Sequence, residues 1–270
     1  MSTDPLAPDS STSDSSARGS RRSPAPRSSP DPRSSADLSP SADSVPDPDP
    51  FAAAALPRSF GDRDVLELAP LLLGCVLVGR GVALRITEVE AYVGAQDPGS
   101  HAYRGRTARN ATMFGEPGHL YVYRHMGLHS CMNVVADVEG SGTGCLVRAG
   151  EIVGGQELAY SRRRASGVCR SDRDLARGPG RATVACGVTF DDDGLDLCDP
   201  RSGMHLAGRL DARDLADGEL PGETPLLPHP RLAVGPRIGL REEASHPELF
   251  PWRYRIAGDP TVSGPGRMNR

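Results

Sequence analysis

The segment CVLVGRGVALRITEVEAY, residues 75–92, decides the fold because it predicts two neighbouring antiparallel strands. Gly79-Arg80-Gly81 interrupts two runs of aliphatic residues, which is typical of a tight turn between paired strands. In the second strand, alternation predicts one face that carries Ile86, Glu88, Glu90 and Tyr92. Both faces of this strand then mix polar and apolar side chains. A surface strand could hold the two glutamates without consequence, so their role depends on what surrounds them.

The remaining pattern predicts a mixed α/β single domain with an antiparallel sheet, because most strands are joined by hairpins. Residues 93–118 form a long connection, and a loop of this length inside a domain is usually functional. The other predicted elements are a helix over 64–75 that Pro70 kinks or splits, strands over 119–124 and 128–135 joined at His125-Met126-Gly127, a strand over 144–149, a helix over 151–164 weakened by Gly154-Gly155, and a helix that opens near Gly180.

Residues 1–52 differ from the rest of the chain and consist mostly of Ser, Pro, Asp, Ala and Arg. They hold too little apolar surface to offset the entropy of ordering, so we expect a disordered tail followed by one domain over 53–270. The tail has 8 Asp and 5 Arg of the 35 acidic and 31 basic residues, which leaves 27 and 26 for the domain. The domain is therefore nearly neutral, and a basic surface on it must be a local patch.

Targeting signals and cysteine spacing indicate a cytoplasmic protein. The tail lacks the apolar core of a secretory signal, and no window reaches the roughly 18 consecutive apolar residues of a membrane span. The six cysteines form no CxxC pair and no dense framework, so we expect free thiols.

All 31 basic residues are arginine, since the chain contains no lysine. It therefore cannot form a Schiff base through a lysine side chain, and it lacks the lysine of a nucleotide-binding phosphate loop. Two large classes of enzyme are excluded on this ground.

Aromatic residues and histidines gather in one part of the chain. Although aromatics make up only 4% of the sequence, Tyr92, Tyr103, Phe114, Tyr121 and Tyr123 fall close together, with His101, His119, His125 and His129 among them. Each tyrosine taken alone could be an ordinary core residue. No HExxH metal motif and no G-x-S-x-G nucleophile motif is present, which argues against a zinc enzyme and a serine hydrolase.

A run of arginines follows, at positions 162, 163, 164, 170, 173, 177 and 181, and it contains few acidic residues. It is either the solvated face of a helix or a surface that contacts phosphates. The GPGR sequence at 178–181 could direct the N-terminal amides of a helix toward an anion, or simply begin a helix. A carboxylate and aromatic rings beside a basic surface suit an enzyme that extrudes a base from DNA.

The chain resembles the bacterial type of the alkyladenine (3-methyladenine) DNA glycosylase family. The resemblance rests on ITEVEAY, on His101, on RGRTARNATMFGEPGHLYVYRHMGLHSCMNVV and on LVRAGE, and continues more weakly through ARGPGRATVACGV, PRIGL and PWRYRI. It covers residues 57–258 and implies a curved antiparallel sheet, similar to the C-terminal domain of formyltransferases, with a protruding hairpin that enters DNA. It also implies a monomer that needs no cofactor or metal and acts on duplex DNA with damaged purines.

The resemblance assigns roles residue by residue. The catalytic glutamate falls on Glu90 and the assisting arginine on Arg148, while Tyr92, His101 and Tyr123 would sandwich the flipped base. Asn133 would crowd the exocyclic amine of guanine. Met126 takes the place of the wedge, which is a tyrosine in better-known members, and an apolar methionine can also unstack a base step. Backbone contacts are expected from Arg109, Arg177 and Arg181.

The expected reaction is hydrolysis of the N-glycosidic bond by a water that Glu90 activates, which leaves an abasic site. Enzymes that also cut the strand often use an amine nucleophile, and here the N-terminal amine alone could serve. We therefore expect a monofunctional enzyme. Two alternatives remain: a non-catalytic nucleic-acid-binding protein on the same fold, and a hydrolase of free nucleosides. Neither alternative explains Glu90, the aromatic residues and the arginines together. A binder gains nothing from Glu90, and a nucleoside hydrolase does not need the arginines.

Overall fold

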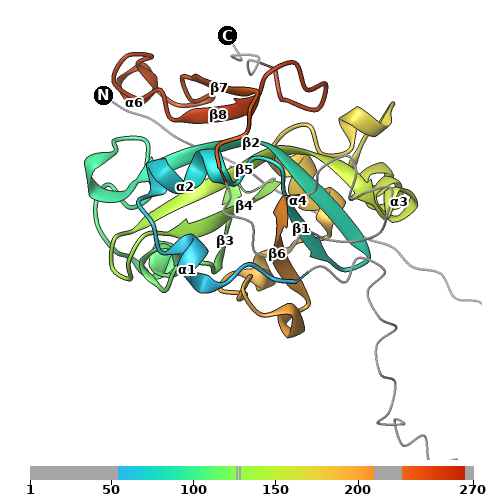
Figure 1. Ribbon diagram of the computed structural model, residues 1–270, viewed down its shortest axis with the longest axis horizontal. Helices are drawn as coiled ribbons and strands as arrows, with labels where there is room; N and C mark the ends of the chain where they lie inside the picture. The colour runs from blue at the N-terminus through green and yellow to red at the C-terminus, as the bar shows by residue number, and fades with distance from the viewer. Residues whose placement is uncertain (1–53, 126, 128, 210–226, 265–270) are drawn as a thin grey trace, which may run out of the picture. The chain divides into compact units, whose positions relative to one another are not determined.

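The β-sheet that carries the candidate site is antiparallel throughout its main path, in the strand order β3-β4-β5-β2-β1-β6 (Figure 1). This is a computed structural model, which describes residues 54–125, 127, 129–209 and 227–264. The strands are β1 (Cys75–Gly79), β2 (Val82–Val93), β3 (Leu120–His125), β4 (His129–Ala136), β5 (Thr143–Gly154), β6 (Met204–Arg209), β7 (Leu232–Gly235) and β8 (Arg253–Ile256). The strand β8 pairs with both β2 and β7, so the C-terminal part of the chain joins the sheet beside β2.

The described α-helices are α1 (Arg58–Gly61), α2 (Val65–Leu71), α3 (Gln156–Ser166), α4 (Pro179–Cys186) and α6 (Glu242–Ser245). Of these, α2, α3 and α4 contact the central strands β2 and β5. One main apolar core unites α2, α4 and these strands, with Leu68, Val89 and Ala185 all fully buried in it. The described residues lie within one compact unit that spans 46–270, so the expected mixed α/β domain with an antiparallel sheet is confirmed. Among the described helices, none has the length and apolar character needed to cross a bilayer.

A β-bulge in β2 separates Ile86 from the face that carries Glu88 and Glu90. In the pairing of β2 with β5, Ile86 lies opposite Gly150 and Glu88 lies opposite Ala149, so Thr87 is left without a partner. Such an extra residue exchanges the two faces of a strand, because side chains alternate with a period of two. Ile86 consequently packs in the main core with Val89 and Ala91, away from Glu88. The predicted face of Ile86, Glu88, Glu90 and Tyr92 was therefore wrong for Ile86.

The turn and helix predictions have mixed outcomes. The tight turn between β1 and β2 is present, and Arg80 and Gly81 adopt positive φ angles of 54° and 72°. Pro70 lies inside α2, which ends one residue later at Leu71. The helix expected over 151–164 was wrong at its start. Residues 151–154 continue β5, and α3 begins only at Gln156.

Gly155 makes the change from strand to helix possible. Its φ angle is +73°, and a Cβ atom at this position would lie 1.9 Å from the backbone oxygen of Gly81. A side chain at this position is excluded both by the left-handed backbone and by the contact with the first hairpin.

We predict that Gly155→Ala lowers the free energy of unfolding by about 3 kcal/mol, because the chain must separate from the Gly81 carbonyl. Gly140→Ala is the matched control, since Gly140 has a φ of +92° and no atom within 4 Å of the added Cβ. It should lower the free energy of unfolding by about 1 kcal/mol, because only the unfavourable backbone conformation contributes. Urea unfolding of both variants tests this, and equal losses would contradict the steric explanation.

Candidate active site

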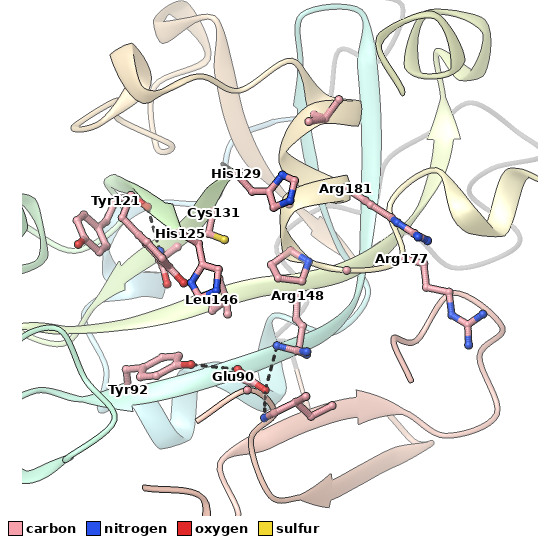
Figure 2. A pocket seen from close by; sticks show the side chains of 18 of the residues that line it. Glu90, Tyr92, Tyr121, His125, His129, Cys131, Leu146, Arg148, Arg177 and Arg181 are labelled. Atoms are coloured by element: carbon pink, nitrogen blue, oxygen red, sulfur yellow. Dashed lines mark hydrogen bonds and ion pairs between the residues drawn. The ribbon is translucent and has the colours of Figure 1, made fainter. Parts of the chain in front are cut away.

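A cavity of about 660 Å³ opens between the sheet and α4 (Figure 2). Its walls come from β2, β3, β4 and β5, from the start of α4, and from the loops that contain His101 and Ile238. Eight of the predicted site residues line this one cavity: Glu90, Tyr92, His101, Tyr123, Asn133, Arg148, Arg177 and Arg181.

Glu90 is completely buried, and both of its carboxylate oxygens have partners. The oxygen Oε1 accepts a hydrogen bond of 2.7 Å from the backbone N–H of Ile238 and lies 3.4 Å from Nη1 of Arg148. The hydroxyl of Tyr92 donates to Oε2 over 3.1 Å. Burial raises the pKa of Glu90, and the opposite charge of Arg148 and the two hydrogen bonds only partly offset this effect. A carboxylate whose pKa is raised in this way is a stronger base than an exposed glutamate.

His101, Tyr121 and Tyr123 form an aromatic wall on one side of the cavity. The ring of His101 meets Tyr123 edge-on at a centroid distance of 4.5 Å, and Tyr121 stacks on Tyr123 at 5.8 Å. Nδ1 of His101 lies 3.1 Å from the hydroxyl of Tyr121. Partial burial, together with the charge of Arg109, lowers the pKa of His101, so its ring is neutral at pH 7. Tyr121 is also fully buried in a small apolar core, so it serves both packing and the wall.

Asn133 and Arg148 close the cavity from the sheet. The side-chain amide of Asn133 donates to the backbone oxygen of Tyr121 over 3.1 Å, which fixes its orientation. Arg148 lies on β5 opposite β2, and its guanidinium is held between Glu88, Glu90 and the hydroxyl of Ser263.

Arg237 supports the cavity from behind, and no local sequence pattern predicts this role. It is buried, and its guanidinium binds both oxygens of Asp97 at 2.5 and 2.6 Å. The same group lies 4.6 Å from the ring centre of Tyr92 and 5.0 Å from that of Trp252. The next residue, Ile238, donates to Glu90. The short segment PRIGL thus positions Tyr92 and Glu90, although it is a weak part of the family resemblance.

The arginine run divides between the interior and the cavity. Arg162 donates to the backbone oxygens of Arg80 and Ala185, so it ties α3 to its neighbours. Arg163, Arg177 and Arg181 line the cavity, and Figure 2 places Arg177 and Arg181 at its far end from Tyr121. The run is therefore neither a plain solvated helix face nor a uniform phosphate surface.

One further predicted residue, Arg109, lies elsewhere. Arg109 does not line the cavity and donates to the backbone oxygen of Arg124 over 3.4 Å. Met126, the expected wedge, is outside the described residues, although the two strands that flank it form the expected hairpin. Within the described part of the chain, no group of three or more His, Cys, Asp or Glu side chains could hold a metal ion.

Comparison with known proteins gives a consistent result. A model of the methylpurine-DNA glycosylase family matches residues 59–260. A protein of Streptomyces avermitilis is 46% identical over 212 residues, which is 77% of this chain and 90% of the relative. A protein of Burkholderia lata is 45% identical, over 81% of this chain and 96% of its own length. A third, from Leifsonia xyli, is 48% identical over 73% and 86%. All three carry names that describe them as candidate 3-methyladenine DNA glycosylases.

The family match covers the whole region that builds the cavity, from β1 to β8. The chain therefore belongs to the methylpurine-DNA glycosylase family, and its activity is that of a DNA-repair glycosylase for alkylated bases.

The raised pKa of Glu90 predicts a pH-dependent effect of Glu90→Gln on stability. Because the folded-state pKa lies above the unfolded value, ionisation of Glu90 opposes folding. This cost is absent below the unfolded pKa and fully present above the folded pKa. The gain in unfolding free energy of the glutamine variant over the wild type should thus be larger at pH 7.5 than at pH 5. Urea unfolding at both pH values measures it, with the exposed Glu116→Gln as control. A gain that stays constant or shrinks with pH would refute the assignment.

Proposed function

We propose that the chain is a monofunctional DNA glycosylase that flips damaged purines out of duplex DNA and hydrolyses their N-glycosidic bond, leaving an abasic site. The substrate class comprises 3-methyladenine, 7-methylguanine, hypoxanthine and ethenoadenine. The observation that carries this proposal is the buried Glu90 carboxylate on the wall of an aromatic cavity, with Arg148, Tyr92 and Ile238 directed at it.

Glu90 acts in two ways. As the glycosidic bond breaks, the sugar acquires oxocarbenium-like positive charge, which a fixed carboxylate in a cavity of low polarity stabilises. The same carboxylate takes a proton from the water that attacks C1′, while the bonding electrons leave with the base. Arg148 lies beside the carboxylate and assists in placing this water. Cationic alkylpurines leave readily, whereas neutral hypoxanthine also requires a proton.

The aromatic residues bind the extruded base. Tyr92 lies beside Glu90, and His101 and Tyr123 belong to the aromatic wall of the same cavity, so we expect a planar base to bind between them. A neutral His101 accepts either a neutral or a cationic base next to it. Asn133, held by the carbonyl of Tyr121, limits the space for an exocyclic amine at this end and so disfavours guanine.

The DNA duplex is proposed to lie across the mouth of the cavity. The β3–β4 hairpin would bring Met126 to the base stack as the wedge, and Arg109, Arg177 and Arg181 would contact phosphates. Arg177 and Arg181 line the cavity beside the start of α4, which supports their role more strongly than that of Arg109. Residues 1–52 are proposed to be a tail outside this enzyme domain of 53–270.

We predict that Glu90→Gln binds damaged duplex DNA as well as the wild type does, but releases the base at least about 10³-fold more slowly, because the amide neither accepts the proton nor stabilises the positive charge. The measurement is single-turnover release of ethenoadenine or hypoxanthine, with Glu116→Gln as the matched control. Binding without release in the wild type would favour the non-catalytic alternative, and release from free nucleosides would favour the third.

The lack of lysine predicts that the purified protein leaves the DNA strand intact. Base release should yield an abasic site that breaks only after treatment with alkali or heat. Denaturing gels of the reaction, with and without alkali, measure this. Strand breaks that appear at the rate of base release without alkali would show lyase activity and contradict the monofunctional mechanism.

A further inference from the structure

Glu88 is a second buried carboxylate, two residues before Glu90, and the mechanism above does not use it. It is fully buried and does not line the cavity, so it cannot touch a bound base. Nε of Arg253 donates to its Oε1 over 2.5 Å, and the backbone N–H of Ser263 donates to its Oε2 over 2.6 Å. Burial of a charged group is costly unless it has such partners, so this arrangement requires a physical explanation.

Arg148 connects this second carboxylate to the first. Its Nε lies 3.2 Å from Oε1 of Glu88 and 3.1 Å from the hydroxyl of Ser263, while its Nη1 lies 3.4 Å from Oε1 of Glu90. A guanidinium group is planar and rigid, so two contacts on the Nε edge fix the direction in which the Nη1 edge points. Glu88 and Ser263 thus determine how Arg148 meets Glu90.

The C-terminal segment completes this support. Ser263 contacts Glu88 through its backbone N–H, Arg253 through its backbone oxygen at 2.9 Å, and Arg148 through its hydroxyl. Its neighbour Val262 accepts a hydrogen bond from Arg177 over 2.9 Å. Ser263 lies 115 residues after Arg148 in the sequence, so a distant segment of the chain is part of the site.

We propose that Glu88 is a positioning residue, which holds Arg148 beside Glu90 and divides the charge of its guanidinium between two carboxylates. The proposal rests on the catalytic function proposed for Glu90. Glu88 balances part of the positive charge of Arg148. Only the remaining part of that charge stabilises the anionic form of Glu90. Glu88 thereby keeps Glu90 basic enough to accept a proton.

Several titratable or charged groups, Glu88 among them, surround Glu90. The titratable or charged groups that face Glu90 come from five strands and are Glu88 and Tyr92 on β2, Tyr123 on β3, Cys131 on β4, Arg148 on β5 and Arg253 on β8. Glu88 is the carboxylate in this set. Removal of the charge of Glu88 leaves the two arginines with one carboxylate, so the anionic form of Glu90 becomes more favourable.

The test is the pH dependence of single-turnover release of 7-methylguanine from duplex DNA, corrected for spontaneous loss. This base is already cationic and needs no protonation, so activity should fall in a single step as the pH falls through the pKa of Glu90. We expect Glu88→Gln to move the midpoint of this step to lower pH by about one unit and to lower the maximal rate roughly tenfold. The glutamine keeps the size of the side chain and one acceptor oxygen, which can take the hydrogen bond of either Arg253 or Ser263, while its NH2 group faces the other donor.

Arg253→Gln gives the opposite test, because it removes a cation and should move the midpoint to higher pH. It also serves if Glu88→Gln does not fold, as judged by thermal unfolding. Glu116→Gln, which removes a carboxylate from an exposed pair with Arg58, is the control and should leave the midpoint unchanged.

Folded variants that lose rate at an unchanged midpoint would overturn the proposal, because a purely structural role of Glu88 lowers the rate at every pH alike. A wild-type protein that releases no base, or a Glu90→Gln variant that keeps the acid step of the wild type, would instead refute the proposed function and this inference with it.

Discussion

One guanidinium between two buried carboxylates is the interaction on which the site depends. Arg148 lies within 3.4 Å of both Glu88 and Glu90, and neither carboxylate reaches bulk solvent. Without Arg148, the buried charges of Glu88 and Glu90 would lie close together with less compensation, which costs on the order of several kcal/mol. With Arg148 and Arg253 present, the group is balanced, and the remaining penalty of burial appears as the raised pKa of Glu90. The fold therefore holds a carboxylate of raised pKa where the proposed reaction needs a base.

The sheet provides this arrangement through a local irregularity. The bulge at Thr87 directs Ile86 into the core, while Glu88 and Glu90 lie on the opposite face of β2. The strand β8 then lies beside Glu88 and Glu90, and it brings Arg253 within reach. On the same side of the cavity as Glu90, the buried pair of Arg237 and Asp97 supports Tyr92 from behind. The first hairpin, the C-terminal strand and the PRIGL segment thus act together, although they are distant in sequence.

The features that could be predicted from the sequence depend on local patterns or on motifs. The turn at Gly79–Gly81 follows from glycine spacing, and the gathering of Glu90, Tyr92, His101, Tyr123, Asn133 and Arg148 follows from the family resemblance. Alternation failed at Thr87, because a bulge is set by pairing with β5 and has no signature in a single strand. The start of α3 was missed because residues 151–154 remain paired with β2. The Arg237–Asp97 pair joins positions 140 apart, and no local pattern reports such a contact.

The most direct test of this account is a carbon-13 NMR titration of the glutamate side-chain carboxyl groups, with the Glu90 signal assigned by its absence in Glu90→Gln. The account predicts that this carboxyl group titrates clearly above the usual glutamate value of about 4.3. A pKa at or below that value would mean that Arg148 dominates over burial. Glu90 would then be an ordinary structural ion pair, and the catalytic role proposed for it would lose its physical basis.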